Sequence, residues 1–502
     1  MMFVLQRIGL AHLPRSTILL IMEEVKVSHR FNVLTFTVML AFAALAQAQT
    51  FTTLYLAGNT HEVGHWLNLG DGATPLESMT FGTSRSLYST GPSEKILYNF
   101  QGGSDGVQPE SRLVADSAGN FYGTTAGAFC GDTGQCGTVF ELKRPEAPGQ
   151  PWAETVLYNF CPQIITCPDG YQPSGGLVFD SKGNLYGATL WGGPGGSGTI
   201  FELSPQPGGG WAFTTIYGFT GGDGALPNGD LVVDHMGNLF GTTANSGKRG
   251  DGTAFELSPP SGNGNNWSLV TIRSFDALRA GGAAPSAGLV MNAEGNLYGT
   301  TSYGGVGNCH GSGAEHGCGL IFKLIPPKKP GAPWGYQILY KFQGGTTDGQ
   351  NPESLLLRDS AGNLYGTTPG GGPGNGCGIA FKLTESGGSW TESVLHYFQS
   401  AGDGCVPLGP LVLDRDGNAF GTTWQGGSSA GGTVFELSPT SDGWTETVVH
   451  SFLKNGVDGY APFGGVIADF GALYGTTAVG GTGDCVLGEQ TGCGTVFKVA
   501  SR

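Results

Sequence analysis

The sequence predicts an all-β protein, a seven-bladed β-propeller built from four-stranded antiparallel blades. The stretch G-N-L-Y-G-T-T occurs seven times with small variations, and successive copies begin 54 to 67 residues apart. Such a period is typical of repeat architectures. Each repeat also offers four short pieces rich in Val, Ile, Thr, Tyr and Phe, bounded by Gly, Pro, Asn or Asp, which is the pattern of strands and turns. Four strands in each of seven units describe the blades of a propeller.

The turn that opens each copy supports this division into strands. An Asp or Asn stands two or three residues before the first glycine of every copy, and such a residue opens a type I turn that a left-handed glycine completes. We therefore interpret these residues as turn formers. They are Asp116, Asp180, Asp234, Asn292, Asp359, Asp414 and Asp469.

Two aromatic positions recur with the repeat. The ring after the turn is expected to pack between neighbouring blades, where each ring buries about 150–250 Å². These rings are Tyr122, Tyr186, Phe240, Tyr298, Tyr365, Phe420 and Tyr474. A tryptophan opens the fourth strand of six units, at Trp152, Trp211, Trp267, Trp334, Trp390 and Trp444. Because the positions are equivalent, we favour a structural role for the tryptophans over sugar stacking.

Counting strands predicts how the ring closes. The last unit ends after its third strand, residues 494–499, whereas a piece like a fourth strand, residues 94–100, precedes the first unit. The N-terminal piece is expected to complete the last blade. Closure of this kind removes the exposed strand edges of an open array.

The chain divides into three parts. Residues 1–48 form a signal peptide region, because basic residues precede an apolar run at 31–45 and Ala46-Gln47-Ala48 fits a cleavage site; Met22 is an alternative start. Residues 49–93 are a non-repeat segment, and residues 94–502 are the propeller. We expect a secreted or cell-surface protein without a transmembrane helix in the mature chain.

Composition excludes some partners. The net charge of −15 argues against nucleic acid and anionic membrane surfaces. We expect an extracellular glycan or protein ligand of unknown identity, and a monomer. No cofactor is expected, with calcium and zinc as the open alternatives.

The ten cysteines predict disulfides, since an exported chain with an even count is expected to oxidise them. All ten fall in loops that an antiparallel blade places at one end of the ring. The predicted pairs are Cys130–Cys136, Cys161–Cys167, Cys309–Cys318, Cys377–Cys405 and Cys485–Cys493. Cys309-His310 and His316-Gly317-Cys318 also offer a zinc set, which we weigh below a disulfide.

The same end of the ring carries recurrent Asp-Gly pairs. Six aspartates around a central axis are candidate binding residues for calcium or a polyhydroxylated ligand, although Asp-Gly is also a common turn. The candidates are Asp105, Asp169, Asp223, Asp348, Asp403 and Asp458. The fourth unit, residues 275–285, lacks the pair.

One catalytic motif stands outside the repeat. His61-Glu62-Val63-Gly64-His65 is H-E-x-x-H, in which two histidines hold zinc and a glutamate acts as general base. Residues 61–71 resemble the metzincin metalloproteases, with Asp71 at the place of the third ligand and Met79 as a candidate methionine turn. His61, His65 and Asp71 are therefore weak metal candidates, because the upstream metzincin sheet and helix have no room here.

The repeat G-N-L-Y-G-T-T, followed by G-T-V-F-E-L and L-Y-x-F, resembles the bacterial GloVer (Gloeobacter/Verrucomicrobia) tandem repeat over residues 94–499. The resemblance implies an exported or surface protein of the choice-of-anchor type and carries no activity. The turn is more distantly similar to NHL propeller repeats, whose usual role is binding.

The leading functional hypothesis is an extracellular binding or scaffold module without catalysis of its own. It depends on the observation that no His, Glu or Lys breaks the repeat symmetry as an active site would. The alternative is an extracellular enzyme, either a propeller glycan hydrolase or lyase, or a zinc metalloprotease using residues 61–71.

Overall fold

The computed structural model describes residues 94–127, 136–147, 149–161, 167–261, 266–277, 281–307, 309, 317–329, 331–400, 402–469, 471–487 and 490–500. All of them belong to one compact unit, Trp66–Arg502. The signal peptide region 1–48, with Met22, and the segment 49–93, with His61, His65, Asp71 and Met79, lie outside the described residues.

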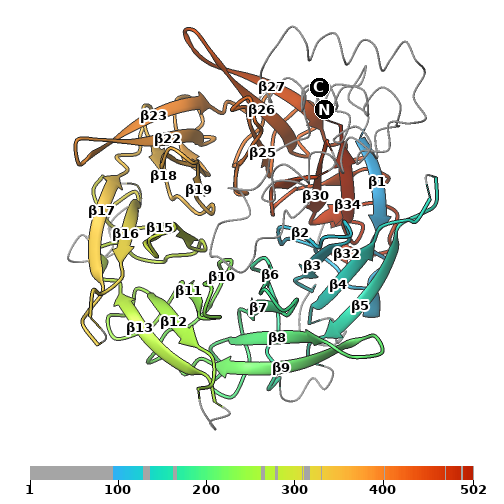
Figure 1. The fold of residues 1–502 in the computed structure, drawn as a ribbon. Coiled ribbons are helices and arrows are strands. Elements are labelled where there is room, and N and C mark those ends of the chain that lie inside the picture. Colours follow the sequence, from blue (N-terminus) through green and yellow to red (C-terminus); the bar gives the residue numbers. More distant parts are fainter. Residues whose placement is uncertain are drawn as a thin grey trace, which may run out of the picture. The chain divides into compact units, whose positions relative to one another are not determined.

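The described residues form an all-β propeller of seven blades, each a four-stranded antiparallel sheet, as predicted (Figure 1). Blade 1 contains β2 (Val114–Ala115), β3 (Phe121–Thr125), β4 (Thr138–Lys143) and β5 (Ala153–Asn159). Blade 2 contains β6 (Val178–Phe179), β7 (Leu185–Thr189), β8 (Thr199–Pro205) and β9 (Trp211–Gly218). Blade 3 contains β10 (Val232–Val233), β11 (Leu239–Thr243), β12 (Thr253–Ser258) and β13 (Ser268–Ser274). Blade 4 contains β14 (Val290–Met291), β15 (Leu297–Thr301), β16 (Leu320–Ile325) and β17 (Gly335–Lys341).

The remaining blades follow the same order. Blade 5 contains β19 (Leu357–Arg358), β20 (Leu364–Thr368), β22 (Ile379–Ser386) and β23 (Ser389–Tyr397). Blade 6 contains β24 (Val412–Leu413), β25 (Ala419–Thr423), β26 (Thr433–Thr440) and β27 (Gly443–Ser451). Blade 7 contains β29 (Val466–Asp469), β30 (Ala472–Thr477), β34 (Thr495–Val499) and β1 (Glu94–Asn99). The loops add η2 (Gly103–Asp105), β18 (Gly349–Gln350), β21 (Gly370–Gly371), β28 (Gly459–Tyr460), β31 (Val479–Gly480), β32 (Val486–Leu487) and β33 (Gln490–Thr491).

The ring closes through the N-terminal strand. β1 pairs antiparallel with β34, with Glu94 opposite Val499 and Asn99 opposite Thr495. Figure 1 shows the blue β1 beside the red β34. The fourth strand of blade 7 therefore comes from the start of the repeat domain, as the strand count predicted.

The repeated turn has the predicted geometry. In blade 1 the N–H of Gly119 donates to the carbonyl of Asp116 at 3.0 Å, and Gly119 has a φ of 81°. The Asp116 carboxylate also accepts the N–H of Asn120 and the amide group of its side chain, both within 2.9 Å. The aspartate and the asparagine thus fix the hairpin together, so their recurrence has a structural cause.

The aromatic residue after the turn packs on the next blade. Tyr122 contacts Phe179 and Trp211 of blade 2, with centroid separations of 5.2 and 6.0 Å. Tyr186 meets Trp267, and Phe240 meets Trp334, in the same way. The tryptophans of the outer strands therefore have the structural role that their regular spacing indicated.

The glycine inside L-Y-G-T-T makes room for a phenylalanine of the third strand. Gly123 stands opposite Phe140 in the register, and a Cβ on Gly123 would lie 2.7 Å from the tip of that ring. The outer strand of the preceding blade ends in a buried phenylalanine, Phe100, whose edge meets the Phe140 ring. The centroids of these two rings are 5.1 Å apart. This Phe–Phe pair recurs at all seven blade junctions, at 5.0 to 5.3 Å.

This crowding predicts unequal effects of two Gly→Ala changes. A Cβ on Gly187 would lie 2.5 Å from the Phe201 ring, whereas one on Gly222 would meet nothing within 4 Å. Neither glycine needs a positive φ. We expect Gly187→Ala to lower the free energy of unfolding by about 1–3 kcal/mol through overpacking, and Gly222→Ala to be neutral or slightly stabilising. Thermal unfolding of both variants measures the difference, and equal behaviour would contradict the packing argument.

Candidate functional site

One end of the ring carries the loops between second and third strands and the loops that lead from each outer strand to the next blade. We call this end the loop face. The Cys377–Cys405 disulfide joins one loop of each kind, with a Cα separation of 4.6 Å. The predicted pairs Cys161–Cys167, Cys309–Cys318 and Cys485–Cys493 are also disulfides. Disulfides of this number are typical of proteins that fold in an oxidising, extracellular environment.

Two predictions on this face fall partly outside the described residues. Cys136 is disulfide-bonded, but its predicted partner Cys130 is not described. His310 and His316, the imidazoles of the alternative zinc set, are not described either. Cys309 and Cys318 are joined to each other.

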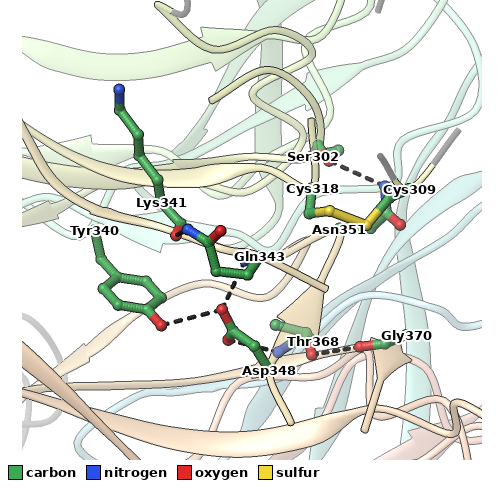
Figure 2. Close-up of a disulfide and its surroundings, with 11 residues drawn as sticks. Ser302, Cys309, Cys318, Tyr340, Lys341, Gln343, Asp348, Asn351, Thr368 and Gly370 are labelled. Carbon is green, nitrogen blue, oxygen red and sulfur yellow. Dashed lines mark hydrogen bonds between the residues drawn. A yellow bond between two sulfur atoms is a disulfide. The ribbon is translucent and has the colours of Figure 1, made fainter. Parts of the chain in front are cut away.

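The disulfides pack against the connecting loops. A Cβ on Gly344, in the loop from blade 4 to blade 5, would lie 2.4 Å from the Cys309 sulfur. A Cβ on Gly102 would likewise lie 2.8 Å from the Cys485 sulfur. Figure 2 shows the Cys309–Cys318 disulfide together with Gln343, whose N–H donates to Asp348. Each disulfide therefore braces a loop that crosses from one blade to the next.

The six candidate aspartates bind the ends of the outer strands, which form the rim of the ring (Figure 1), and do not gather around its axis. Asp348 accepts the hydroxyl of Tyr340 at 3.1 Å and the N–H of Gln343 at 2.6 Å (Figure 2). The N–H after the buried phenylalanine is accepted in the same way by Asp105, Asp169, Asp223, Asp403 and Asp458. In the fourth unit Gly281 takes the place of the aspartate.

At each blade junction the aspartate belongs to a set of three residues, which we call a junction trio. The first member stands two residues before the buried phenylalanine of one outer strand. The second is the aspartate of the connecting loop. The third stands on the outer strand of the next blade. In chain order the trios are Tyr98–Asp105–Glu154, Tyr158–Asp169–Phe213, Tyr217–Asp223–Leu269, Arg273–Gly281–Tyr336, Tyr340–Asp348–Glu392, His396–Asp403–Glu446 and His450–Asp458–Glu94.

The trios break the repeat symmetry. Four first members are tyrosines, but blade 3 has Arg273, and blades 5 and 6 have His396 and His450. Two histidines therefore break the symmetry at this half-buried position, because their imidazoles replace a phenol. That no His, Glu or Lys does so as an active site would stays a prediction. The signal was present in the sequence, because aligning the seven L-Y-x-F stretches exposes the histidines. Their four carboxyl partners, however, lie at four different distances along the chain.

Four trios hold two carboxyl groups side by side. Burial and the neighbouring aspartate raise the pKa of Glu154 to about 8 and that of Glu392 to about 7. Burial and Asp458 raise the pKa of Glu94 to about 8, and burial and Asp403 raise that of Glu446 to about 7. Glu94 and Glu154 also hydrogen-bond to the aspartate beside them. Burial is the larger cause of the raised pKa values, and the cost of placing two negative charges in one space adds to it.

The two histidine trios differ in geometry. The Nε2 atom of His396 is 3.0 Å from Asp403 Oδ2, a hydrogen-bond distance. The Nε2 atom of His450 instead stands 3.5 Å from Asp458 Oδ2 and 3.9 Å from Glu94 Oε2, and it has no hydrogen-bond partner. Among the described residues, Glu94, His450 and Asp458 form a set whose ligand atoms lie within 4.8 Å of one another.

The loop face also carries side chains that vary between repeats. Directly after each second strand, one residue pairs with a residue of the connecting loop, as Trp191 does with Tyr171. Equivalent pairs are Ala225–Asn245, Ala283–Tyr303 and Cys405–Gln425. Trp191 is 41% exposed, and Tyr171 is half-buried. Because directly paired residues point to the same side of a ladder, blade 2 presents two aromatic side chains together.

Comparison with known proteins identifies the repeat. A family model described as the Gloeobacter/Verrucomicrobia repeat matches residues 135–312 and 307–502. The search of curated proteins found no match. Among the described residues, no helix has the length and apolar character needed to cross a membrane.

Solved structures match this chain only at low similarity. A luciferin-regenerating enzyme is 13% identical, with a TM-score of 0.37, over 66% of this chain and 92% of its own. A gluconolactonase from Xanthomonas campestris is 13% identical, with a TM-score of 0.35, over 66% and 85%. A glucose dehydrogenase is 12% identical, with a TM-score of 0.36, over 66% and 96%. At these values the similarity carries no inference about activity.

Loop length predicts how much two of the disulfides contribute to the free energy of unfolding. Cys377 and Cys405 are 28 residues apart, whereas Cys161 and Cys167 are 6 apart. Under the chain-entropy model, replacing the first pair by alanine should cost about 3.5 kcal/mol and replacing the second about 2 kcal/mol. Equilibrium denaturation of the two double variants measures both losses. A larger loss for Cys161→Ala/Cys167→Ala would show that local packing outweighs loop closure.

The carboxyl pairs predict pH-dependent stability. Glu154 faces Asp105 and Tyr98, and Glu392 faces Asp348, Tyr340 and Tyr397. Because folding raises both glutamate pKa values above the unfolded value of 4.5, their contribution is fully present below that pH. It is lost as the pH rises through about 7 for Glu392 and about 8 for Glu154.

We therefore expect the melting temperature of the native chain to fall as the pH rises from 5 to 9. In the Glu154→Gln/Glu392→Gln variant we expect this decrease to be smaller. The amide is uncharged at every pH and can donate to the aspartate as the protonated acid does. Calorimetry across this range checks the prediction. An unchanged pH profile in the variant would assign the dependence to other groups.

Proposed function

The chain belongs to the Gloeobacter/Verrucomicrobia repeat family, and from the distribution of its repeated and varied residues we propose that it is an exported binding module that holds a glycan or protein ligand on the loop face. Among the residues that recur seven times, the junction phenylalanines and the rings packed between blades are internal, and the turn formers hold the hairpins at the opposite end of the blades. Side chains that differ between blades stand on the loop face. A scaffold that repeats its interior and varies one rim suits recognition.

The single observation that carries the proposal is the aromatic pair of blade 2. Trp191 is exposed at 41% and is held by backbone hydrogen bonds to Tyr171 at 2.9 and 3.3 Å. An exposed indole on a hydrogen-bonded backbone offers an apolar face at little conformational cost, which suits a sugar ring or an apolar side chain of a protein ligand. The repeated aspartates support the proposal indirectly, because they hold the loops at the outer strands.

Export is part of the proposal. Residues 1–48 are assigned as the signal peptide region, and the disulfides of the loop face support an oxidising destination. The disulfide-braced loops also support a preformed surface, which lowers the cost of ordering loops on binding. We propose that the protein acts as a monomer.

The test compares two exposed side chains at opposite ends of the ring. Binding of the purified protein to glycan and peptide arrays is measured for the native chain, Trp191→Ala and Met236→Ala. Met236 is 66% exposed in the hairpin between β10 and β11, at the other end of the blades. We expect Trp191→Ala to weaken binding at least about tenfold, corresponding to one stacking contact of about 1.5 kcal/mol, and Met236→Ala to have no effect. Native binding that survives Trp191→Ala would contradict the assignment.

The enzymatic alternatives are separated in the same experiment. A propeller glycan hydrolase or lyase, or a zinc metalloprotease using residues 61–71, would convert the bound glycan or peptide into fragments. Mass spectrometry of each array ligand after incubation detects such products. Recovery of intact ligand supports a module without catalysis, and release of fragments supports the enzyme.

A further inference from the structure

The junction between blades 6 and 7 brings together three potential metal ligands from separate parts of the chain. His450 lies on β27, the outer strand of blade 6, and Asp458 lies in the loop that leads to blade 7. Glu94 lies on β1, the strand that closes the ring. The three therefore meet at the junction between blades 6 and 7, which we call the closing junction because its third member lies on the strand that closes the ring.

Their separations suit one small cation. His450 Nε2 is 3.5 Å from Asp458 Oδ2 and 3.9 Å from Glu94 Oε2. Ligand atoms at zinc distances of about 2.0–2.2 Å in tetrahedral geometry stand about 3.4 Å apart. A small contraction of the trio would thus reach zinc geometry, which leaves a fourth position for water.

An unpaired polar atom provides a second, independent indication. His450 Nε2 has no hydrogen-bond partner, and the His450 side chain is only 16% exposed. Beside it, Glu94 hydrogen-bonds to Asp458, which is 6% exposed, so one of these two carboxyl groups carries a proton. Buried polar atoms are normally paired, so the unpaired imidazole nitrogen beside this carboxyl pair needs an explanation. A bound cation would replace the shared proton, coordinate all three side chains and compensate for their burial.

The chemistry of the set selects the kind of metal. One imidazole and two carboxylates are ligands for zinc and other first-row divalent ions. Calcium prefers six to eight oxygen ligands, and an imidazole nitrogen is not among them. The side chains of His450 and Glu94 are 16% and 12% exposed, which leaves a path for an ion to enter.

The equivalent trios in the same chain show what changes at this junction. Tyr98–Asp105–Glu154 has the same two carboxyl groups, but a phenol donates to the aspartate at 2.6 Å where His450 stands. His396–Asp403–Glu446 has the same three residue types, but its imidazole is hydrogen-bonded to Asp403 at 3.0 Å. An imidazole without a hydrogen-bond partner, facing two carboxyl groups, is found at the closing junction within the described residues.

We propose that Glu94, His450 and Asp458 form a binding site for zinc or a similar divalent ion, which ties the closing strand β1 to blade 6. β1 is held in blade 7 by non-covalent pairing with β34. The ion adds a link from β1 to an outer strand and a loop of the neighbouring blade. The site is structural, and it is independent of the ligand on the loop face.

The experiment measures zinc binding and its effect on β1. The full chain, freed of metal with a chelator and titrated with Zn²⁺, should bind about one ion at this site, melt a few degrees higher, and show slower amide exchange in β1. Cobalt(II) should give the absorption of a tetrahedral site. Failure to bind Zn²⁺ or Co²⁺ above the level of the variants below would overturn the proposal.

His450→Tyr is the decisive variant, because it recreates the tyrosine trio that this fold already accommodates at Tyr98 and Tyr340. We expect it to retain its melting temperature in chelator and to lose zinc binding at least 100-fold. His396→Tyr is the matched control one blade away and should bind zinc like the native chain. Equal loss in both histidine variants would overturn the assignment to the closing junction.

A last variant separates this site from the H-E-x-x-H motif. His61→Ala/His65→Ala should leave the stoichiometry and the slower exchange of β1 unchanged at this junction. If the zinc-dependent effect on β1 disappears in that variant and persists in His450→Tyr, the ion is held by residues 61–71 and the proposal is wrong.

Discussion

The propeller depends on one contact that is made seven times, the pair of phenylalanine rings at each blade junction, which is edge-to-face at six junctions and tilted at the seventh. The outer strand of one blade ends in a ring that is at most 1% exposed, and this ring meets a third-strand phenylalanine of the next blade at 5.0 to 5.3 Å. The receiving ring fits because glycine stands opposite it on the second strand. Such pairs add about 0.5–1.5 kcal/mol each beyond the apolar area that they bury, so glycine and phenylalanine form a single structural unit.

The polar layer above these pairs follows from the same geometry. Where an outer strand ends, its last N–H groups need acceptors, and the aspartate of the connecting loop supplies one at six junctions. The glycine after the aspartate faces the threonines of the inner strands, and a Cβ on Gly170 would lie 2.0 Å from Thr189 Oγ1. Asp-Gly therefore recurs because this position needs a hydrogen-bond acceptor, and the next position has no room for a side chain. The disulfides add covalent bracing on the outside of these loops.

The fold was predictable because repetition turns one chain into seven comparable examples. Strand number, hairpin geometry and ring closure follow from periodic residues such as Gly119, Asp116 and Trp152, and the described disulfide pairs follow from the placement of the cysteines in the loops of one end. The junction trios could not be predicted in this way, because each combines residues from two outer strands and a loop. Glu94 and Asp458, for example, are 364 positions apart in the sequence. Sequence spacing contains no information on which outer strands face each other until the ring is built. The histidines were visible in the sequence, but without partners they gave no reason to single them out.

The closing junction differs from the others in what holds it. In blades 1 to 6 the outer strand follows its third strand directly along the chain, so the hairpin connection keeps it in place. In blade 7 the outer strand is the distant β1, and its pairing with β34 is broken whenever the N-terminal end of the repeat domain detaches. Detachment would expose the edge of β34, which is the kind of edge that promotes association between chains. A metal link from Glu94 to His450 and Asp458 acts on this strand, whereas the same link at any other junction would join elements that the chain already connects.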